Sequence, residues 1–186
     1  GYRHRPLDTR AGTIDVAGAV LERVSRSARE RQLVKALRGD LRDHETDYVL
    51  IDCPPSLGLM TVNALVAADE ILIPIQCEYY ALEGVTQLLK TINLVKGRLN
   101  DNLVLSTVLL TMFDGRTNLA SQVADEVRKH FTRETLDTVI PRSVRVAEAP
   151  SYGQTVLTYQ LNSVGAQAYL AAAQEIARIL SFPAAI

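Results

Sequence analysis

Short apolar runs recur along this chain, and between them apolar residues follow a helical spacing. The runs are Tyr48–Ile51, Glu70–Ile75, Leu103–Met112 and Thr138–Ile140. A run of Val, Leu and Ile without polar alternation is typical of a strand covered on both faces, as in a parallel sheet. The pattern therefore predicts four strands, and Pro74 is expected to mark the end of the second because proline cannot donate to a ladder.

The segments between the runs repeat apolar residues at intervals of three and four, the spacing of one helix face. They predict helices over residues 14–41, with Gly39 and Asp40 closing the first, and over Leu57–Ala68, Leu82–Leu99, Asn118–Phe131 and Ser163–Ser181, whereas Arg142–Thr155 is expected to be irregular. Strands that alternate with helices favour right-handed βαβ crossovers. The prediction is an α/β fold: a mostly parallel sheet with helices on both faces.

Composition and charge narrow the class of protein. The chain has 186 residues, 47% of them hydrophobic, and a net charge of −1, which favours one domain with its own core and requires any DNA-binding patch to be local. Cys53 and Cys77 form no CxxC pair, which favours reduced thiols in a cytosolic protein. Residues 1–11 lack the apolar segment of a secretory signal and are expected to be a disordered leader. No apolar run approaches the roughly twenty residues of a membrane span.

The first apolar run is followed by residues whose side chains can take part in chemistry. It is followed at once by Asp52 and then by two prolines. Open α/β sheets bind ligands at the carboxyl ends of their strands, and an acid there can hold Mg²⁺ through water and orient a nucleotide phosphate. The residues alone equally allow Asp52 to be a simple strand-end acid and Ser56 a helix N-cap.

A phosphate-binding loop would complete such a site, and the sequence contains none. The pattern G-x-x-x-x-G-K-[ST] has no match, and Gly97, which follows Lys96, has no second glycine at the required spacing. From the residues alone the site is therefore incomplete.

Four blocks in the same order resemble the ParA/Soj family of chromosome- and plasmid-partitioning ATPases, which belong to the MinD-like P-loop class. They are Asp47–Gly58, Ile73–Gly84, Leu110–Leu119 and Val139–Ser151, and Gly12–Ala19 resembles the family more weakly. The first block resembles the Walker B and switch II segment. The family's amino-terminal part, with its deviant Walker A loop, has no counterpart in the sequence. The resemblance implies that residues 12–186 are the C-terminal two-thirds of a ParA-like ATPase domain.

The resemblance also implies roles for single residues. Asp52 would be the Walker B acid that acts on Mg²⁺ through water, and Pro54, Pro55 and Ser56 would belong to switch II, which senses the γ-phosphate of ATP. The loops that approach adenine in the family match Met112, Asp114, Pro141 and Arg142. The alternative is that the prolines only redirect the chain and that these loops are plain strand-end turns.

DNA binding is implied in the same way. ParA-like dimers bind DNA without sequence preference through surface cations, which need only phosphate contacts. The candidates here are Arg116, Arg142, Arg145, Arg128, Lys129 and Arg133. For the last three the alternative is that they complement the dipole of a helix C-terminus, where cations are favoured.

The implied function is an ATPase of DNA segregation that is cytoplasmic and associated with the nucleoid. It would bind ATP and Mg²⁺, form a homodimer with ATP, coat DNA and hydrolyse ATP under stimulation by a ParB-type centromere-binding partner. Because the phosphate loop is missing, this chain alone is expected to be inactive. The alternative is a non-hydrolysing remnant that acts as a DNA- or partner-binding module.

Two further interpretations are disfavoured. A MinD-like membrane ATPase would attach through a terminal basic amphipathic helix, whereas Ile179–Ile186 contains no lysine and is interrupted by a proline. An iron–sulfur cluster on Cys53 and Cys77, as in the related nitrogenase iron proteins, is disfavoured because the sequence around these cysteines is different.

Overall fold

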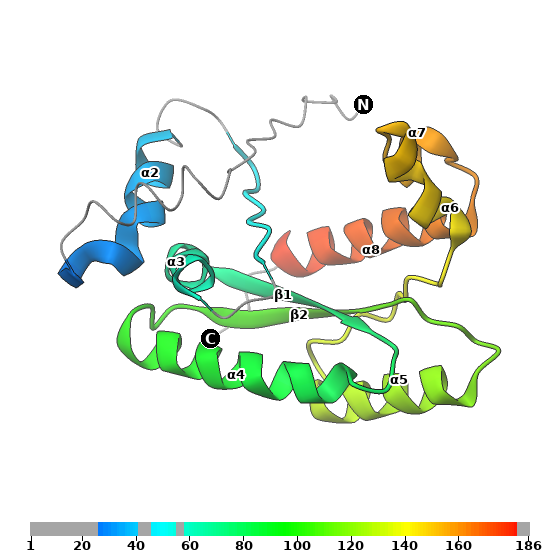
Figure 1. Cartoon of the computed structure of the whole chain (residues 1–186), viewed down its shortest axis with the longest axis horizontal. Coiled ribbons are helices and arrows are strands. Elements are labelled where there is room, and N and C mark those ends of the chain that lie inside the picture. Colours follow the sequence, from blue (N-terminus) through cyan, green and yellow to red (C-terminus); the bar gives the residue numbers. More distant parts are fainter. Residues whose placement is uncertain (1–25, 41–45, 55–57, 182–186) are drawn as a thin grey trace. The chain divides into compact units, whose positions relative to one another are not determined.

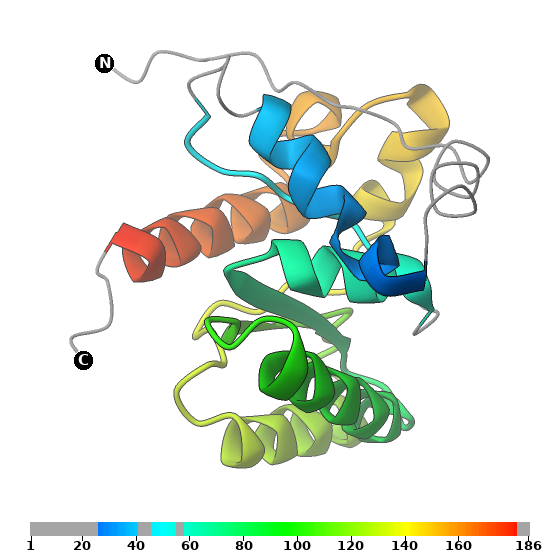
Figure 2. The same cartoon turned by 90° about the vertical axis from the view of Figure 1, so that its left-hand side faces the viewer.

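A computed structural model describes residues 26–40, 46–54 and 58–181, which divide into two units (Figures 1 and 2). The first unit comprises the described residues up to Ala68 together with Val95–Asp101. The second comprises Asp69–Leu94 and the described residues from Asn102 onward.

The second unit is built on two parallel strands. β1 (Glu70–Gln76) pairs with β2 (Val104–Thr111), from Glu70 opposite Val104 to Gln76 opposite Thr111. The chain passes from one to the other through the long helix α4 (Ala81–Arg98), because parallel neighbours need a crossover. Both strands and this helix were predicted from the apolar pattern, and these predictions are confirmed.

Burial along β1 differs from the prediction. Ile71, Ile73 and Ile75 are buried, whereas the residues between them are exposed, Leu72 by 40%. Only one face of β1 is therefore covered. Pro74 does not end the strand but lies within it. The N–H of Cys77 donates to the carbonyl of Thr111 at 2.9 Å, so by alternation Pro74 turns its missing donor away from β2, where no bond is lost.

On the other side of β2 the predicted strand Thr138–Ile140 is wrong. Residues 134–142 follow β2 through separate hydrogen bonds, such as Leu136 N–H to Val108 O at 3.0 Å and Ile140 N–H to Leu110 O at 2.8 Å, and through two isolated bridges. The bridges join Val108 to Thr135 and Phe113 to Pro141, so this segment advances one residue more than β2 between them. The slip interrupts the pairing, which remains as two isolated bridges rather than a continuous ladder.

Helices lie on both sides of the strand pair, as predicted, although only β2 is buried on both faces. α4 and α5 (Asn118–His130) lie on one side and α8 (Val164–Ser181) on the other (Figures 1 and 2). Leu109 packs with Leu136, Ile140 and Ala172, which connects β2 to α8. Val108 and Leu110 point to the opposite face and are fully buried. β2 therefore crosses the centre of this core.

The segment predicted to be irregular is instead mostly helical. It forms α6 (Val144–Glu148) and the 3₁₀ turn η2 (Ala149–Tyr152), and α7 (Val156–Tyr159) follows. Local signals begin and end these turns: Pro150 stands in the first turn of η2, Gly153 ends it at φ 64°, and Thr155 and Thr158 form a capping box. The elements join through a small core of Ala149, Val156 and Ala166.

In the first unit, η1 (Arg26–Arg31) and α2 (Gln32–Asp40) pack on α3 (Leu59–Ala67). These elements agree with the predicted helices to the extent that residues 14–41 are described. Asn63, only 4% exposed, joins them: its Oδ1 accepts the N–H groups of Gln32 and Leu33 at 3.1 and 3.3 Å, and its Nδ2 donates to the carbonyls of Arg29 and Leu59 at 2.8 and 3.0 Å. One side chain thus satisfies backbone groups of all three elements.

Candidate functional site

The segment that carries Asp52 is extended, but it is not the buried strand that its sequence predicts. Residues 48–54 have no regular secondary structure, and Tyr48 and Leu50 are 57% and 87% exposed. A strand becomes regular only beside a partner, and within the described residues this run pairs with no strand. The apolar side chains consequently remain in water.

Asp52 itself is exposed at the end of this segment. Burial is the main cause that raises the pKa of the Cys53 thiol, and the charge of Asp52 is the second. The Sγ of Cys53 lies 3.6 Å from the carbonyl oxygen of Ile51. Pro54 is exposed, and the predicted switch residues Pro55 and Ser56 lie outside the described residues. Within the described part of the chain no three His, Cys, Asp or Glu side chains gather as a metal cage. An exposed carboxylate of this kind suits a hydrated Mg²⁺ that is held mainly by phosphates.

In the second unit the predicted adenine-side residues are adjacent to one another. The bridge between Phe113 and Pro141 aligns the loop after β2 with the end of the neighbouring segment, and Arg142 N–H donates to Phe113 O at 2.9 Å. Met112 has a φ of 54°, which non-glycine residues rarely adopt. Strained backbone of this kind clusters at ligand sites, so the turn at Met112 favours a functional loop. The adenine contact itself stays a prediction.

Asp114 fixes the loop after β2. Its carboxylate accepts hydrogen bonds from Arg116 Nε at 2.9 Å, Arg116 Nη2 at 2.7 Å and the Arg116 backbone N–H at 3.1 Å. These bonds lower the pKa of Asp114 to about 2. Thr117 caps α5 by accepting the Ala120 N–H at 3.3 Å and donates to Asp114 O at 2.9 Å. The loop is thereby anchored to the helix that follows it.

An ion pair connects this region to the loop after β1. Arg142 Nη2 lies 2.8 Å from Glu78 Oε1, although the two residues are 64 positions apart in sequence. Beside Glu78, the rings of Tyr79 and Tyr80 meet edge to face at 5.1 Å and are 76% and 73% exposed. The sequence analysis assigned no role to these three residues. The signal available was the run Glu78-Tyr79-Tyr80, which follows a strand end.

The predicted DNA-binding residues fall into two groups. Arg116, Arg142 and Arg145 are each paired with a carboxylate; for Arg145 this is Glu148, at 2.9 Å, and the bond raises the pKa of Arg145. The others lie at the end of α5 or just after it: Lys129 is 3.4 Å from Glu126, and Arg128 lines a shallow hollow with Asp125, Lys129 and Thr132, while the side chain of Arg133 is exposed. Both groups are exposed and can reach phosphate, and DNA contact stays a prediction for each.

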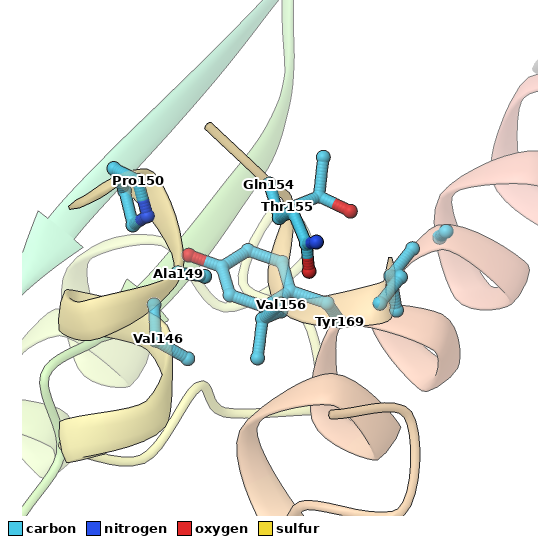
Figure 3. Close-up of a pocket in the computed structure, with 9 residues that line it drawn as sticks. Val146, Ala149, Pro150, Gln154, Thr155, Val156 and Tyr169 are labelled. Atoms are coloured by element: carbon cyan, nitrogen blue, oxygen red, sulfur yellow. The ribbon is translucent and has the colours of Figure 1, made fainter. Parts of the chain in front are cut away.

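A third feature is an apolar cavity of about 410 Å³ between α6, η2, α7 and α8 (Figure 3). Tyr169 lies across it, and Gln154 and Thr155 stand together at one side. The remaining lining residues are aliphatic: Val146, Ala149, Pro150, Val156, Leu157 and Ala173. Its only titratable lining group is the phenol of Tyr169, so the cavity offers shape and apolar contact rather than acid–base chemistry.

Comparison with known proteins relates these features to a family. A family model described as "AAA domain" matches residues 5–105. The chain is 52% identical to the sporulation initiation inhibitor protein Soj of Bacillus subtilis, over 92% of the chain and 67% of that protein. The chain belongs to the ParA/Soj family of partitioning ATPases. Its identity to the chromosome partitioning protein ParA of Myxococcus xanthus is 49%, over 92% of this ParA/Soj-family chain and 60% of that protein. It thus spans between 60% and 67% of the length of these relatives.

Solved structures agree with the predicted fold class. The cobyrinic acid a,c-diamide synthase of Mycobacterium smegmatis, with bound ADP and magnesium, is similar with a TM-score of 0.70 and 35% identity, over 90% of this chain and 60% of that one. The cell division ATPase MinD of Pyrococcus furiosus has a TM-score of 0.64 at 23% identity, over 84% of this chain and 63% of that one, and supports the fold alone. The predicted P-loop NTPase-like α/β fold is confirmed. No helix in the described part of this ParA/Soj-family chain is long and apolar enough to cross a membrane.

Proposed function

We propose that this chain is part of a ParA-like ATPase that segregates DNA. In this proposal the protein binds ATP and Mg²⁺, dimerises with ATP, binds DNA without sequence preference and is stimulated by a ParB-type partner in the cytoplasm, on the nucleoid. The observation that carries the proposal is the 52% identity to Soj together with the ParA proteins among its relatives. The similarity to a synthase with bound ADP and magnesium supports the choice of cofactors.

Within this function Asp52 is the proposed Walker B acid. Its exposed carboxylate would accept hydrogen bonds from water on Mg²⁺, and Pro54, Pro55 and Ser56 would form the switch beside the γ-phosphate. Met112, Asp114, Pro141 and Arg142 are the proposed adenine side. The bound ion would neutralise the developing charge on the transferred phosphoryl group.

The phosphates themselves must be held by residues outside this sequence, because its 186 residues contain no G-x-x-x-x-G-K-[ST] loop. Calorimetry of this chain with ATP and Mg²⁺ should therefore detect no binding heat. Micromolar affinity for ATP would contradict the proposal that residues outside this sequence hold the phosphates.

The ATPase role is tested in the protein that carries the upstream sequence. That sequence should contain a Lys-Gly-Gly-x-Gly-Lys-Thr loop. Asp52→Asn should then lower ATP hydrolysis by about 10- to 100-fold, the usual cost of losing an outer-shell partner of a metal. Asp101→Asn, which changes another exposed acid, is the control. Absence of the loop, with no partner chain that supplies one, would exclude the ATPase role.

A DNA- or partner-binding module without hydrolysis is the second candidate, favoured by the missing loop. The two candidates share the proposed DNA surface, which consists of Arg116, Arg142, Arg145, Arg128, Lys129 and Arg133. In a salt titration with duplex DNA, Arg142→Ala and Arg145→Ala should each reduce the log–log slope by about 0.9, the value of one lost phosphate contact. An unchanged slope would remove the residue from the surface. DNA binding without ATP would favour the second candidate.

A further inference from the structure

Three arginines of the proposed DNA surface are each paired with a carboxylate of the same chain. Arg116 lies 2.7 Å from Asp114, Arg142 2.8 Å from Glu78 and Arg145 2.9 Å from Glu148. All three arginine side chains remain at least half exposed. They are therefore open to solvent but already hold an anion.

One of these pairs differs from the others. Asp114 and Glu148 are only two and three residues from their arginines, so the local backbone brings each pair together. Glu78 and Arg142 stand on loops that are far apart in sequence, and their side chains are 52% and 53% exposed. This pair links the loop after β1 to the loop after residue 140. Loss of the ion pair at Arg142 can thus alter the position of Glu78 and of the neighbouring tyrosines.

A carboxylate and a phosphate compete for the same donors. Both accept charge-assisted hydrogen bonds from the guanidinium fork, and Arg142 cannot give the same N–H to both. Glu78 is bonded to Nη2 of Arg142, so a DNA phosphate that binds Arg142 through Nη2 displaces Glu78, and the intramolecular pair then subtracts from the affinity for DNA.

We propose that Glu78 is a built-in competitor for the DNA backbone, which occupies Arg142 until a phosphate of duplex DNA displaces it. The inference rests on the proposed DNA-binding function and adds a competing group that regulates the same surface. Displacement releases the loop after β1 from the loop after residue 140. DNA contact is then linked to the Glu78–Tyr80 loop, because the DNA phosphate replaces the Glu78 carboxylate at Arg142.

The expected effect is modest because exposed ion pairs are weak. Glu78→Gln should tighten binding of a non-specific duplex by about 1.5- to 5-fold, the range of such pairs. The slope of affinity against salt should stay at the wild-type value, because the same number of phosphates is contacted. Arg142→Ala should instead reduce the slope by about 0.9.

The test is a double-mutant cycle on the whole chain, read by fluorescence anisotropy between 50 and 200 mM salt. It compares wild type, Glu78→Gln, Arg142→Ala and the double variant. Glu70→Gln is the control: it removes the same charge from an exposed acid for which the described residues offer no ion pair. In the Arg142→Ala background, Glu78→Gln should gain no more affinity than Glu70→Gln gives to wild type. Thermal melts of each variant establish that it is folded.

The outcomes separate the inference from the function beneath it. If Glu78→Gln tightens binding equally with and without Arg142, the gain is bulk charge and the inference is overturned, while a reduced slope for Arg142→Ala still upholds the DNA surface. If Arg142→Ala leaves the slope unchanged, the DNA role of Arg142 fails and the inference fails with it. No binding of duplex DNA by wild type at 50 mM salt would overturn the inference and the second candidate function, whereas the ATPase role is decided by the test on the protein that carries the upstream sequence.

Discussion

Removing the buried amide of Asn63 should loosen the packing of η1 and α2 on α3. Asn63→Ala deletes four hydrogen bonds, two of which cap the first turn of α2. Each bond contributes about 0.5–1.5 kcal/mol net, but the two N–H groups share one oxygen and all four bonds are only partly buried, so the loss should be about 2–3 kcal/mol.

The loss of stability should be local because the four hydrogen bonds stay within the first unit. Amide hydrogen exchange followed by mass spectrometry should show protection of residues 26–40 falling by roughly 30- to 150-fold, since 1.4 kcal/mol corresponds to a factor of ten. Protection of β2 should change little. Asn93→Ala is the matched control, because Asn93 is an exposed asparagine in the middle of a helix and gains the same helix propensity.

Two results would refute this reasoning. Unchanged exchange of residues 26–40 in Asn63→Ala would mean that the four bonds do not hold these helices in place. Equal loss of protection in β1 and β2 would mean that Asn63 stabilises the whole chain rather than one unit.

Two further predictions concern the second unit. Gly165→Ala would place a methyl group 2.6 Å from Val146 Cγ2, so it should lower stability by about 1–3 kcal/mol in thermal melts, whereas Gly97→Ala, which meets no atom within 4 Å, should not destabilise; equal melting temperatures would contradict the close packing. Burial raises the pKa of Glu175, but hydrogen bonds from Thr138 and Asp137 outweigh burial and lower this pKa below 4.5. Its stabilising effect should therefore be complete well above pH 4.5 and disappear as the pH falls through the lowered value. Melting temperatures of Glu175→Gln should depend less on pH in that acidic range, and parallel curves would argue against the contact.

The parts of the fold that follow from local sequence could be predicted. The helices α4, α5 and α8 bury one face each, and their spacing of apolar residues is a property of the segment itself. Strands were harder, because a strand depends on its neighbour. The same kind of apolar run produced the ladder of β2, but at Tyr48–Leu50 it produced an exposed segment that pairs with no strand among the described residues.

The candidate site shows the same limit. The Asp114–Arg116 pair spans two residues and could have been read from the turn, whereas Glu78 and Arg142 meet only because the strands bring two distant loops together. The short helices α6 and η2 were missed although Pro150 and Gly153 mark them, because their packing depends on contacts with α8, among them that of Val146 with Gly165. The chemistry of Asp52 came from family resemblance and still depends on a phosphate loop.

Pro74 has a consequence for how this molecule meets other chains. No strand among the described residues pairs with the side of β1 that faces away from β2, and a strand edge of this kind presents a row of backbone donors and acceptors with which another strand can pair. Pro74 removes one donor from the middle of that row. A foreign strand that docks there must leave an acceptor unsatisfied at its centre, whereas β2, on the other side, loses nothing. Pro74 thus limits which strand can pair with this side of β1 and leaves the ladder with β2 intact.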